Sequence, residues 1–181
     1  MKSLSLKSLT RNTAKKGFTL LELSISIVMI ILLGLGIFVL VRSVQASTRA
    51  QTEQGNINAI AACLNSTYQG DYTGLNNQGA KDADCLPYTM KPSTAGVITS
   101  AWGSSVGIAG AAASATDGSV FTITYPSMSS EVCKKLVPGL TKVYERVVVG
   151  NNAALNLQSS AATVITACNA AADQTLVVTG R

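Results

Sequence analysis

Residues 15–41 read KKGFTLLELSISIVMIILLGLGIFVLV, in which two lysines and a glycine precede a long apolar segment. From Leu23 to Val41 the chain carries no charged residue, and these 19 residues are long enough for a membrane-spanning helix. A lone carboxylate at the start of such a helix is energetically costly without a cationic partner. The stretch therefore predicts a membrane helix in which Glu22 has a function.

The helical pattern continues past Arg42 without a break. Residues 43–66 contain no proline and carry an apolar stripe at helical spacing, formed by Ile57, Ile60, Ala61 and Leu64. We therefore expect one helix from about Phe18 to about Ser66, apolar all round over 18–42 and one-sided over 43–66. Such a helix spans about 70 Å, which is too long for the core of a small domain.

Residues 67–181 predict a globular domain of mixed structure. Residues 67–96 are rich in Gly, Asn, Asp and Gln and predict a long loop. Period-two runs and turn residues predict strands at 97–102, 105–109, 120–125, 144–149 and 176–179, with a turn at 110–118. The fold class is therefore α+β, with the long helix packed on an antiparallel sheet.

Two short helices complete the expected domain. Ser129, Ser130 and Glu131 are typical of a helix start, and we expect this helix to end before Pro138. Residues 161–171 predict a short helix or an irregular segment.

The charge distribution separates the first residues from the rest. Five cations and no acidic residue precede the apolar run: Lys2, Lys7, Arg11, Lys15 and Lys16. Nine basic and nine acidic side chains follow, so the body is neutral. A basic head is typical of a cytoplasmic anchor, and a neutral body argues against nucleic-acid binding. The chain has no histidine, and we expect no enzymatic activity, cofactor or metal site.

All cysteines lie beyond the membrane run, at Cys63, Cys85, Cys133 and Cys168. An even number in a translocated body favours two disulfides, and no C-x-x-C spacing indicates zinc. Three pairings are open. We prefer Cys63–Cys85, which joins a loop to the preceding helix, and Cys133–Cys168, which joins a late segment to the middle of the fold.

An ordinary secretory signal is an alternative reading of the first residues, with cleavage after Val44-Gln45-Ala46 and release of a secreted binding domain. A glutamate within the apolar run opposes this alternative. The helical pattern through residue 46 opposes it as well, because a cleavage site is extended.

The combination KKGFTLLE with an uncharged run resembles the class III signal of the type IV pilins and pseudopilins. The resemblance implies a leader of residues 1–17, with Lys15 and Lys16 on the cytoplasmic face. It implies that a prepilin peptidase cuts between Gly17 and Phe18 and methylates the new amine of Phe18.

The same resemblance gives Glu22 a role in assembly. Cleavage creates a cationic α-amine at Phe18, and in this family the amine of one subunit is thought to pair with Glu22 of a neighbour. Residues 18–42 would form the membrane segment and filament core, and residues 67–181 the pilin domain outside the membrane.

The long leader, the pair Cys133 and Cys168, and the stretch SAWGSSVGI at 100–108 are most similar to type IVb pilins. Phe18 and the 17-residue leader lie between the type IVa and IVb patterns. The resemblance implies a homo-oligomeric helical filament, built from an inner-membrane precursor by the pilus assembly machinery of a Gram-negative bacterium. Its implied uses are adhesion, aggregation or conjugative contact with a host or recipient cell surface.

Two further alternatives keep the signal and change the role. A minor pilin or a type II secretion pseudopilin would share the leader, but pseudopilins often carry a calcium site of clustered acids, and the aspartates here are scattered. A DNA-uptake pilin would show a basic stripe. The basic cluster here, Lys134, Lys135, Lys142 and Arg146, has Glu131 and Glu145 nearby and is more typical of a solvated face.

Overall fold

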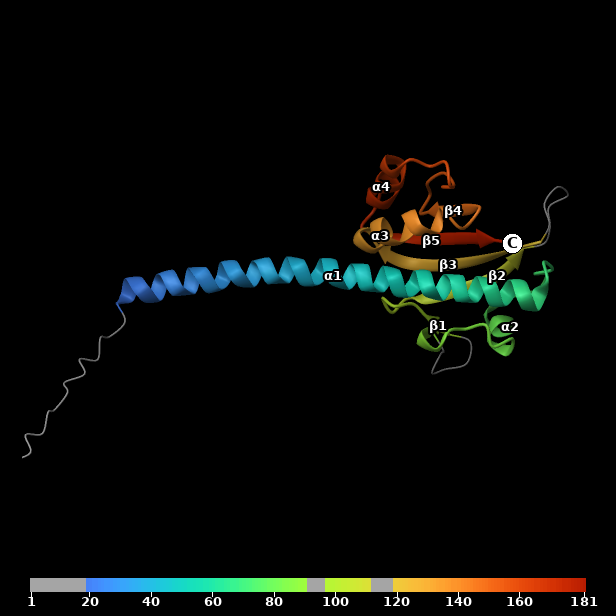
Figure 1. Ribbon diagram of the computed structural model, residues 1–181, viewed down its shortest axis with the longest axis horizontal. Coiled ribbons are helices and arrows are strands. Elements are labelled where there is room, and N and C mark those ends of the chain that lie inside the picture. Colours follow the sequence, from blue (N-terminus) through green and yellow to red (C-terminus); the bar gives the residue numbers. More distant parts are fainter. Residues whose placement is uncertain (1–18, 91–96, 112–118) are drawn as a thin grey trace, which may run out of the picture. The chain divides into compact units, whose positions relative to one another are not determined.

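The computed structural model describes residues 19–90, 97–111 and 119–181, and the chain divides into two compact units, residues 1–40 and 41–181. Helix α1 (Leu20–Tyr68) begins in the first unit and ends in the second (Figure 1). It begins and ends two residues later than the sequence predicts. Phe18 lies outside the described residues.

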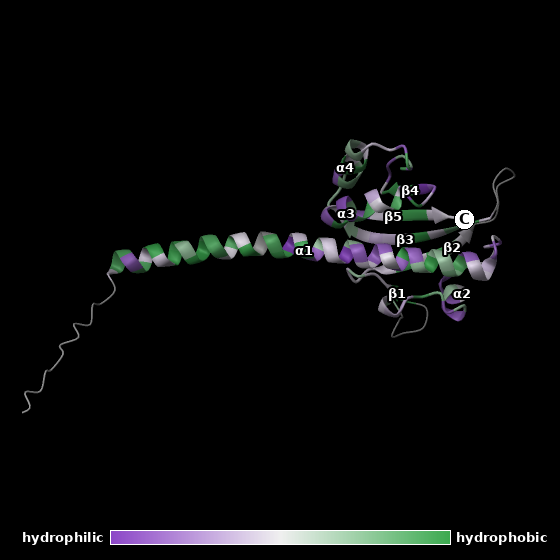
Figure 2. Ribbon diagram, in the orientation of Figure 1, coloured by the Kyte–Doolittle hydropathy of each residue, from purple (hydrophilic) through white to green (hydrophobic). Residues whose placement is uncertain are grey.

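The first unit presents an apolar helix to its surroundings. All described side chains from Leu20 to Ile37 are exposed. The most apolar window of 18 residues in α1 has a mean hydropathy of 2.9. Figure 2 shows hydrophobic residues prevailing along the first part of α1 and hydrophilic residues becoming frequent in its second part. Exposed apolar area is unfavourable in water by about 25 cal/mol per Å². By length and composition, this helix is able to cross a membrane.

The second unit contains a five-stranded antiparallel sheet in the order β1-β2-β3-β5-β4. The strands are β1 (Ile98–Thr99), β2 (Ser105–Ala111), β3 (Val120–Ser129), β4 (Arg146–Val149) and β5 (Asp173–Gly180). The C-terminal strand β5 therefore lies inside the sheet, between β3 and β4. This confirms the expected α+β class with an antiparallel sheet.

The core of the second unit joins the later part of α1 to the sheet. Along β3 the side chains of Phe121, Ile123 and Tyr125 are buried, at the period of two that the sequence shows. They share one hydrophobic cluster with the buried stripe of α1, which contains Ile57, Ile60 and Leu64. The helical and strand periodicities thus meet in one core.

Strand β1 is shorter than the predicted strand at 97–102. The chain turns directly after Thr99: the Ser100 N–H donates to the Ser104 carbonyl at 2.9 Å. Gly103 takes a φ of 86° in this turn, a conformation that glycine adopts without strain. The β1–β2 turn, residues 100–104, therefore replaces the second half of the expected strand.

The predicted turn at 110–118 begins later than expected. Gly110 and Ala111 belong to β2 and pair with β3, and residues 112–118 lie outside the described residues. A side chain at Gly110 would collide with the backbone carbonyl of Tyr72, because an added Cβ would lie 1.7 Å from that oxygen. Gly110 therefore allows β2 to pack closely against Tyr72. The sequence alone predicts this glycine in a turn.

Helix α3 (Ser130–Leu140) runs through Pro138, so the expectation that it ends before this residue is wrong. Proline removes one N–H donor and disfavours a helix interior. The last turn nevertheless closes, because the Thr141 N–H donates to the Val137 carbonyl at 3.0 Å. Leu140 is buried beyond the proline, and its packing favours the extra turn.

The segment 67–96, predicted as a loop, contains helix α2 (Asn77–Asp82) and a 3₁₀ turn (Tyr88–Met90). The Asn76 side chain accepts a hydrogen bond from the Gly79 N–H at 2.9 Å and caps α2. Six residues are too few to show helical periodicity, so only this cap marked the helix in the sequence.

The structure contains the two disulfides Cys63–Cys85 and Cys133–Cys168, which is the pairing that we preferred from the sequence. The first joins α1 to the segment after α2. The second joins α3 to α4 (Ala161–Asn169), and both of its cysteines are fully buried.

Helix α4 offers a test of local capping. Its N-cap Ser160 accepts a hydrogen bond from the Thr163 N–H at 3.2 Å, whereas the N-cap of α3, Ser129, makes no such side-chain bond. We expect Ser160→Ala to lower the free energy of unfolding by about 1 kcal/mol and Ser129→Ala to lower it much less. Denaturant titrations of the two variants measure this difference, and equal losses would contradict it.

Candidate assembly site

The start of α1 places Glu22 in the first helical turn. The Thr19 hydroxyl accepts a hydrogen bond from the Glu22 N–H at 3.3 Å, and the Thr19 carbonyl accepts from the Leu23 N–H at 3.1 Å. Thr19 therefore caps the helix. A carboxylate in this turn is favoured by the helix dipole, so the local sequence fixes both the helix start and the position of the charge.

The other polar side chains of this segment satisfy themselves within the helix. The Ser24 hydroxyl donates to the Leu21 carbonyl, and the Ser26 hydroxyl donates to the Glu22 carbonyl, both at 2.8 Å. Such back-bonds remove the cost of placing a hydroxyl in an apolar environment. In the described part of this unit, the Glu22 carboxylate is then the polar group that still needs an external partner.

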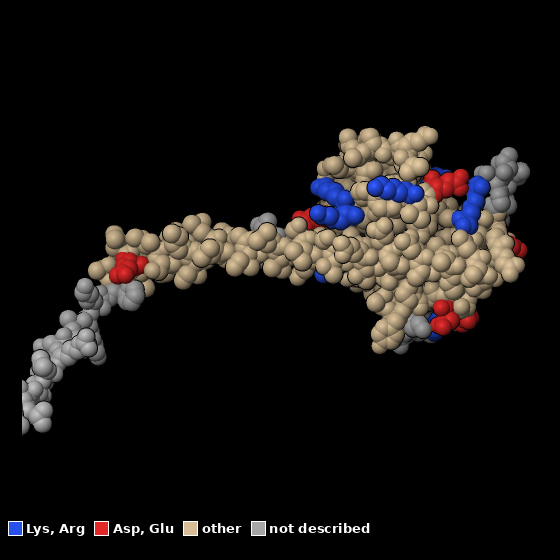
Figure 3. Space-filling model, in the orientation of Figure 1, with Lys and Arg blue, Asp and Glu red and all other residues tan. Residues whose placement is uncertain are grey.

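Figure 3 shows an acidic patch near the start of α1, followed on the visible face by turns without Lys, Arg, Asp or Glu. An exposed carboxylate beside a long apolar surface suits two processes: insertion into a bilayer, and lateral packing with similar helices around a cation. The arrangement therefore indicates a segment for association.

The remaining predicted site residues of the leader are Lys15, Lys16, Gly17 and Phe18. They lie outside the described residues. The structure therefore does not test cleavage and methylation, which stay predictions.

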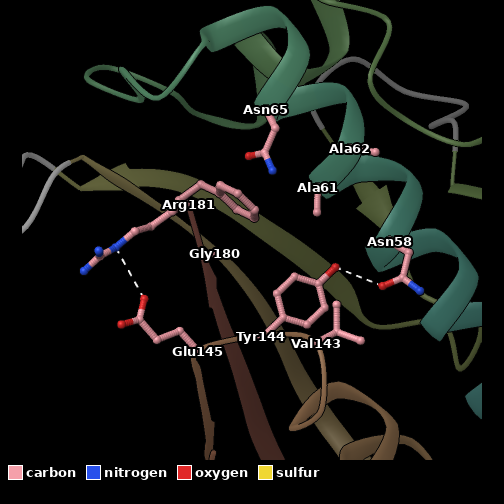
Figure 4. A pocket seen from close by; sticks show the side chains of 10 residues that line it. Asn58, Ala61, Ala62, Asn65, Val143, Tyr144, Glu145, Gly180 and Arg181 are labelled. Carbon is pink, nitrogen blue, oxygen red and sulfur yellow. Dashed lines mark hydrogen bonds and ion pairs between the residues drawn. The ribbon is translucent and has the colours of Figure 1, made fainter. Parts of the chain in front are cut away.

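The second unit has a groove of about 450 Å³ between the later part of α1 and the end of the sheet (Figure 4). Ala61 is among its lining residues, and the Tyr144 hydroxyl donates to the Asn58 side-chain oxygen at 3.0 Å. Burial raises the pKa of Tyr144 to about 12, so this hydroxyl keeps its proton at neutral pH. At the rim, Arg181 and Glu145 form an ion pair at 3.3 Å.

Glu53 is a buried charged position that our sequence analysis missed. Its side chain has no exposed area, and its carboxyl accepts hydrogen bonds from the Ala101 N–H and from the Asn56 side-chain nitrogen. A signal was present. Six of the buried positions of α1 follow one another in alternating steps of four and three, at 46, 50, 53, 57, 60 and 64. Extending the apolar stripe backwards from Ile57 places Glu53 in the core.

Comparison with known protein families matches residues 47–181 to the family described as PilS N terminal. The match covers more than half of the chain. The chain belongs to the PilS family. No curated protein matches it.

Among solved structures, this pilin is similar to TcpA, a type IV pilin from Vibrio cholerae El Tor biotype. The TM-score is 0.52 at 19% sequence identity, over 76% of this chain and 99% of that chain. This likeness shows that the chain has the type IV pilin fold.

As a type IV pilin, the chain is a structural subunit and not an enzyme. Pilins form filaments, which makes the chain a homo-oligomeric subunit. The apolar start of α1 fits a membrane-anchored precursor that later enters a pilus.

Proposed function

We propose that the chain is a prepilin that prepilin peptidase cleaves between Gly17 and Phe18, with methylation of the new amine of Phe18. The mature subunit rests in the inner membrane of a Gram-negative bacterium through residues 18–42. The assembly machinery then polymerises it into a surface filament. Residues 43–66 join the membrane segment to the pilin domain, residues 67–181.

The geometry of Glu22 is the observation that carries this proposal. Its carboxylate is exposed in the first turn of α1, and no partner is recorded for it in the described part of the chain. Cleavage before Phe18 creates an amine four positions earlier. That amine is not well placed to reach Glu22 of its own straight helix, but the amine of a neighbouring subunit is free to do so.

Pairing between subunits would set the position of each new subunit in the filament. A buried ion pair adds little net stability compared with apolar packing, but an unpaired buried charge is strongly unfavourable. A subunit that docks out of register would leave Glu22 unpaired among apolar helices. The carboxylate therefore selects one docking position, while the apolar surface of α1 supplies the attraction.

The structure disfavours the alternative of ordinary signal-peptidase cleavage after Ala46. Residues 44–47 lie inside the continuous helix α1, and Ala46 is buried in the core of the second unit. Cleavage there would remove part of the buried stripe.

We infer that the filament acts at the cell surface in adhesion, aggregation or conjugative contact. The neutral charge of the residues from Phe18 onward supports dense self-packing, because excess like charge would oppose it. We assign the chain to the main subunit rather than to a minor pilin or a pseudopilin, and its abundance in the filament tests this assignment.

Intact-mass analysis of protein sheared from the cell surface tests the proposal. We expect the dominant species to begin at N-methylated Phe18 and to gain the mass of four hydrogens on reduction, two for each disulfide. A chain that begins at Ser47 would overturn the pilin processing. A chain that begins at Phe18 but forms only a trace of the sheared material would assign it to a minor pilin.

A further inference from the structure

Helix α1 carries a carboxyl at a fully buried position of its second part. Glu53 has no exposed area, and it lies on the stripe whose other members include Ala50 and Ile57. Buried carboxyls are rare unless a cation accompanies them. The neighbouring positions of this stripe are apolar, so this carboxyl is a feature that needs its own explanation.

The carboxyl connects α1 to other elements. One oxygen accepts from the Ala101 N–H in the β1–β2 turn, and the other accepts from the Asn56 side chain at 3.2 Å. Asn56, also buried, accepts in turn from the Thr89 hydroxyl at 2.8 Å. Glu53 thus attaches the β1–β2 turn directly, and the 3₁₀ turn through one intermediate.

A buried phenol lies next to this network. Tyr125 on β3 has no exposed area. Among the buried side-chain polar atoms of the described residues, its hydroxyl is the one without a partner at ordinary hydrogen-bond geometry. Burial, and after it the Glu53 carboxylate, raise the pKa of Tyr125 well above its usual range. The phenol is therefore neutral and gives the carboxylate no compensating charge.

Among the residues that the structure describes, no cation is in contact with Glu53. In the described structure its recorded contacts come from neutral donors. On α1, Arg49 lies one turn earlier and is exposed. The titratable groups on the sheet side are Tyr125 and, acting on Tyr125, Tyr144. The β1–β2 turn contributes a backbone N–H, and the 3₁₀ turn a neutral hydroxyl.

We propose that Glu53 is a pH-sensitive latch, which holds the β1–β2 turn against α1 while its carboxyl is protonated and loosens that attachment when the carboxyl ionises. A protonated carboxyl keeps its carbonyl oxygen for Ala101 and gains an O–H that is free to donate to the Tyr125 oxygen. Ionisation leaves a negative charge in the core, where no cation of the described residues contacts it. Hydration would stabilise such a charge. We expect water to reach it through the exposed β1–β2 turn.

The direction of the pH effect follows from burial. Burial raises the pKa of Glu53 above its ordinary value, and the interactions with Ala101, Asn56 and the Tyr125 hydroxyl, which lower it, oppose this only in part. The folded chain therefore holds the proton more tightly than the unfolded chain. The stabilisation is complete below the unfolded glutamate pKa, about 4.3, and is lost as the pH rises through the folded pKa.

The single tryptophan of the chain reports on the latch. Trp102 follows the residue whose N–H Glu53 holds, and its ring centroid lies 5.4 Å from that of Tyr125. Its indole N–H donates to the Pro126 carbonyl at 3.3 Å. Water entry at the β1–β2 turn changes the environment of this one fluorophore.

The test is tryptophan emission and thermal unfolding of the full-length chain in detergent micelles, from acidic to mildly alkaline pH. We expect the emission of the wild type to titrate with a midpoint above the ordinary glutamate pKa, and that of Glu53→Gln to stay flat. Relative to Glu53→Gln, the melting temperature of the wild type should fall by roughly 3–6 °C across this transition. Glu145→Gln removes an exposed carboxylate and should titrate like the wild type.

A transition that persists in Glu53→Gln, or a wild type without one, would overturn the latch. If Glu53→Gln fails to fold, carbon-13 NMR of the side-chain carboxyls decides on the wild type, because the chain has four glutamates. The signal of Glu53 should titrate with a midpoint above the ordinary glutamate pKa, and an ordinary midpoint for Glu53 would overturn the proposal. These measurements need no filament, so their outcome is separate from that of the assembly proposal.

Discussion

A chain with Glu22→Ala should accumulate in the membrane at the wild-type level and yield about 100-fold less sheared filament, or lower still. The substitution removes one partner of the proposed pair between subunits and leaves the amine of Phe18 unpaired among apolar helices. Breaking a buried pair in this way costs about 3–5 kcal/mol. Such a penalty at every docking step stops growth. Glu22 lies in the first unit, so we expect the second unit to fold as in the wild type.

Immunoblots of the sheared and membrane fractions measure this effect. Ser24→Ala is the matched control, because it removes a polar side chain of the same segment whose hydroxyl bonds only within the helix. Glu22→Asp keeps the charge and should retain part of the yield. Wild-type amounts of filament from Glu22→Ala would refute the pairing.

Removing the disulfide Cys133–Cys168 should cause the largest loss of stability in the second unit. The bond closes a loop of 35 residues, for which chain entropy predicts a stabilisation of about 4 kcal/mol. Both cysteines are fully buried between α3 and α4, so alanine at these positions also leaves space in the core. Denaturant titration of Cys133→Ala/Cys168→Ala, followed by Trp102 emission, measures the loss.

The other disulfide provides the comparison. Cys63–Cys85 closes a loop of 22 residues, for which chain entropy predicts about 3 kcal/mol, and Cys63 is only half-buried. Cys63→Ala/Cys85→Ala should therefore be the more stable of the two double variants. The reverse order would show that the α1 attachment, and not the α3–α4 pair, limits the stability of the pilin domain.

Patterns with long repeats predicted the structure well. The apolar run and the stripe through Ile60 extend over many turns, so α1 was located to within two residues. The alternation in β3 was visible for the same reason. The prediction failed for short elements. Helix α2 has six residues and β1 has two, which are too few for a periodic pattern to be visible. The sequence predicted that α3 ends before Pro138, but the helix continues because packing of its final turn outweighs the N–H donor that proline lacks.

The two carboxylates of interest differ in the same respect, because the sequence reveals Glu22 and only the structure reveals Glu53. Glu22 stands out in sequence because no other charge lies near it in the apolar run, and a charge in such a run is conspicuous without any fold. Glu53 looks ordinary in a stretch that also holds Arg49 and Gln54. Only the packing of α1 against Tyr125 and the β1–β2 turn makes its carboxyl a buried group.

By itself, the sequence determined the long helix, its apolar first part, the position of the carboxylate at its start and the α+β class, because each depends on composition or periodicity along neighbouring residues. The tertiary structure decided the strand order, the truncation of β1 and the environment of Glu53. These depend on contacts between residues far apart in the chain: Ala101 meets Glu53 across 48 positions, and Tyr144 meets Asn58 across 86. Local physics fixes which residues form elements, and only burial shows which of their polar groups must find partners inside the protein.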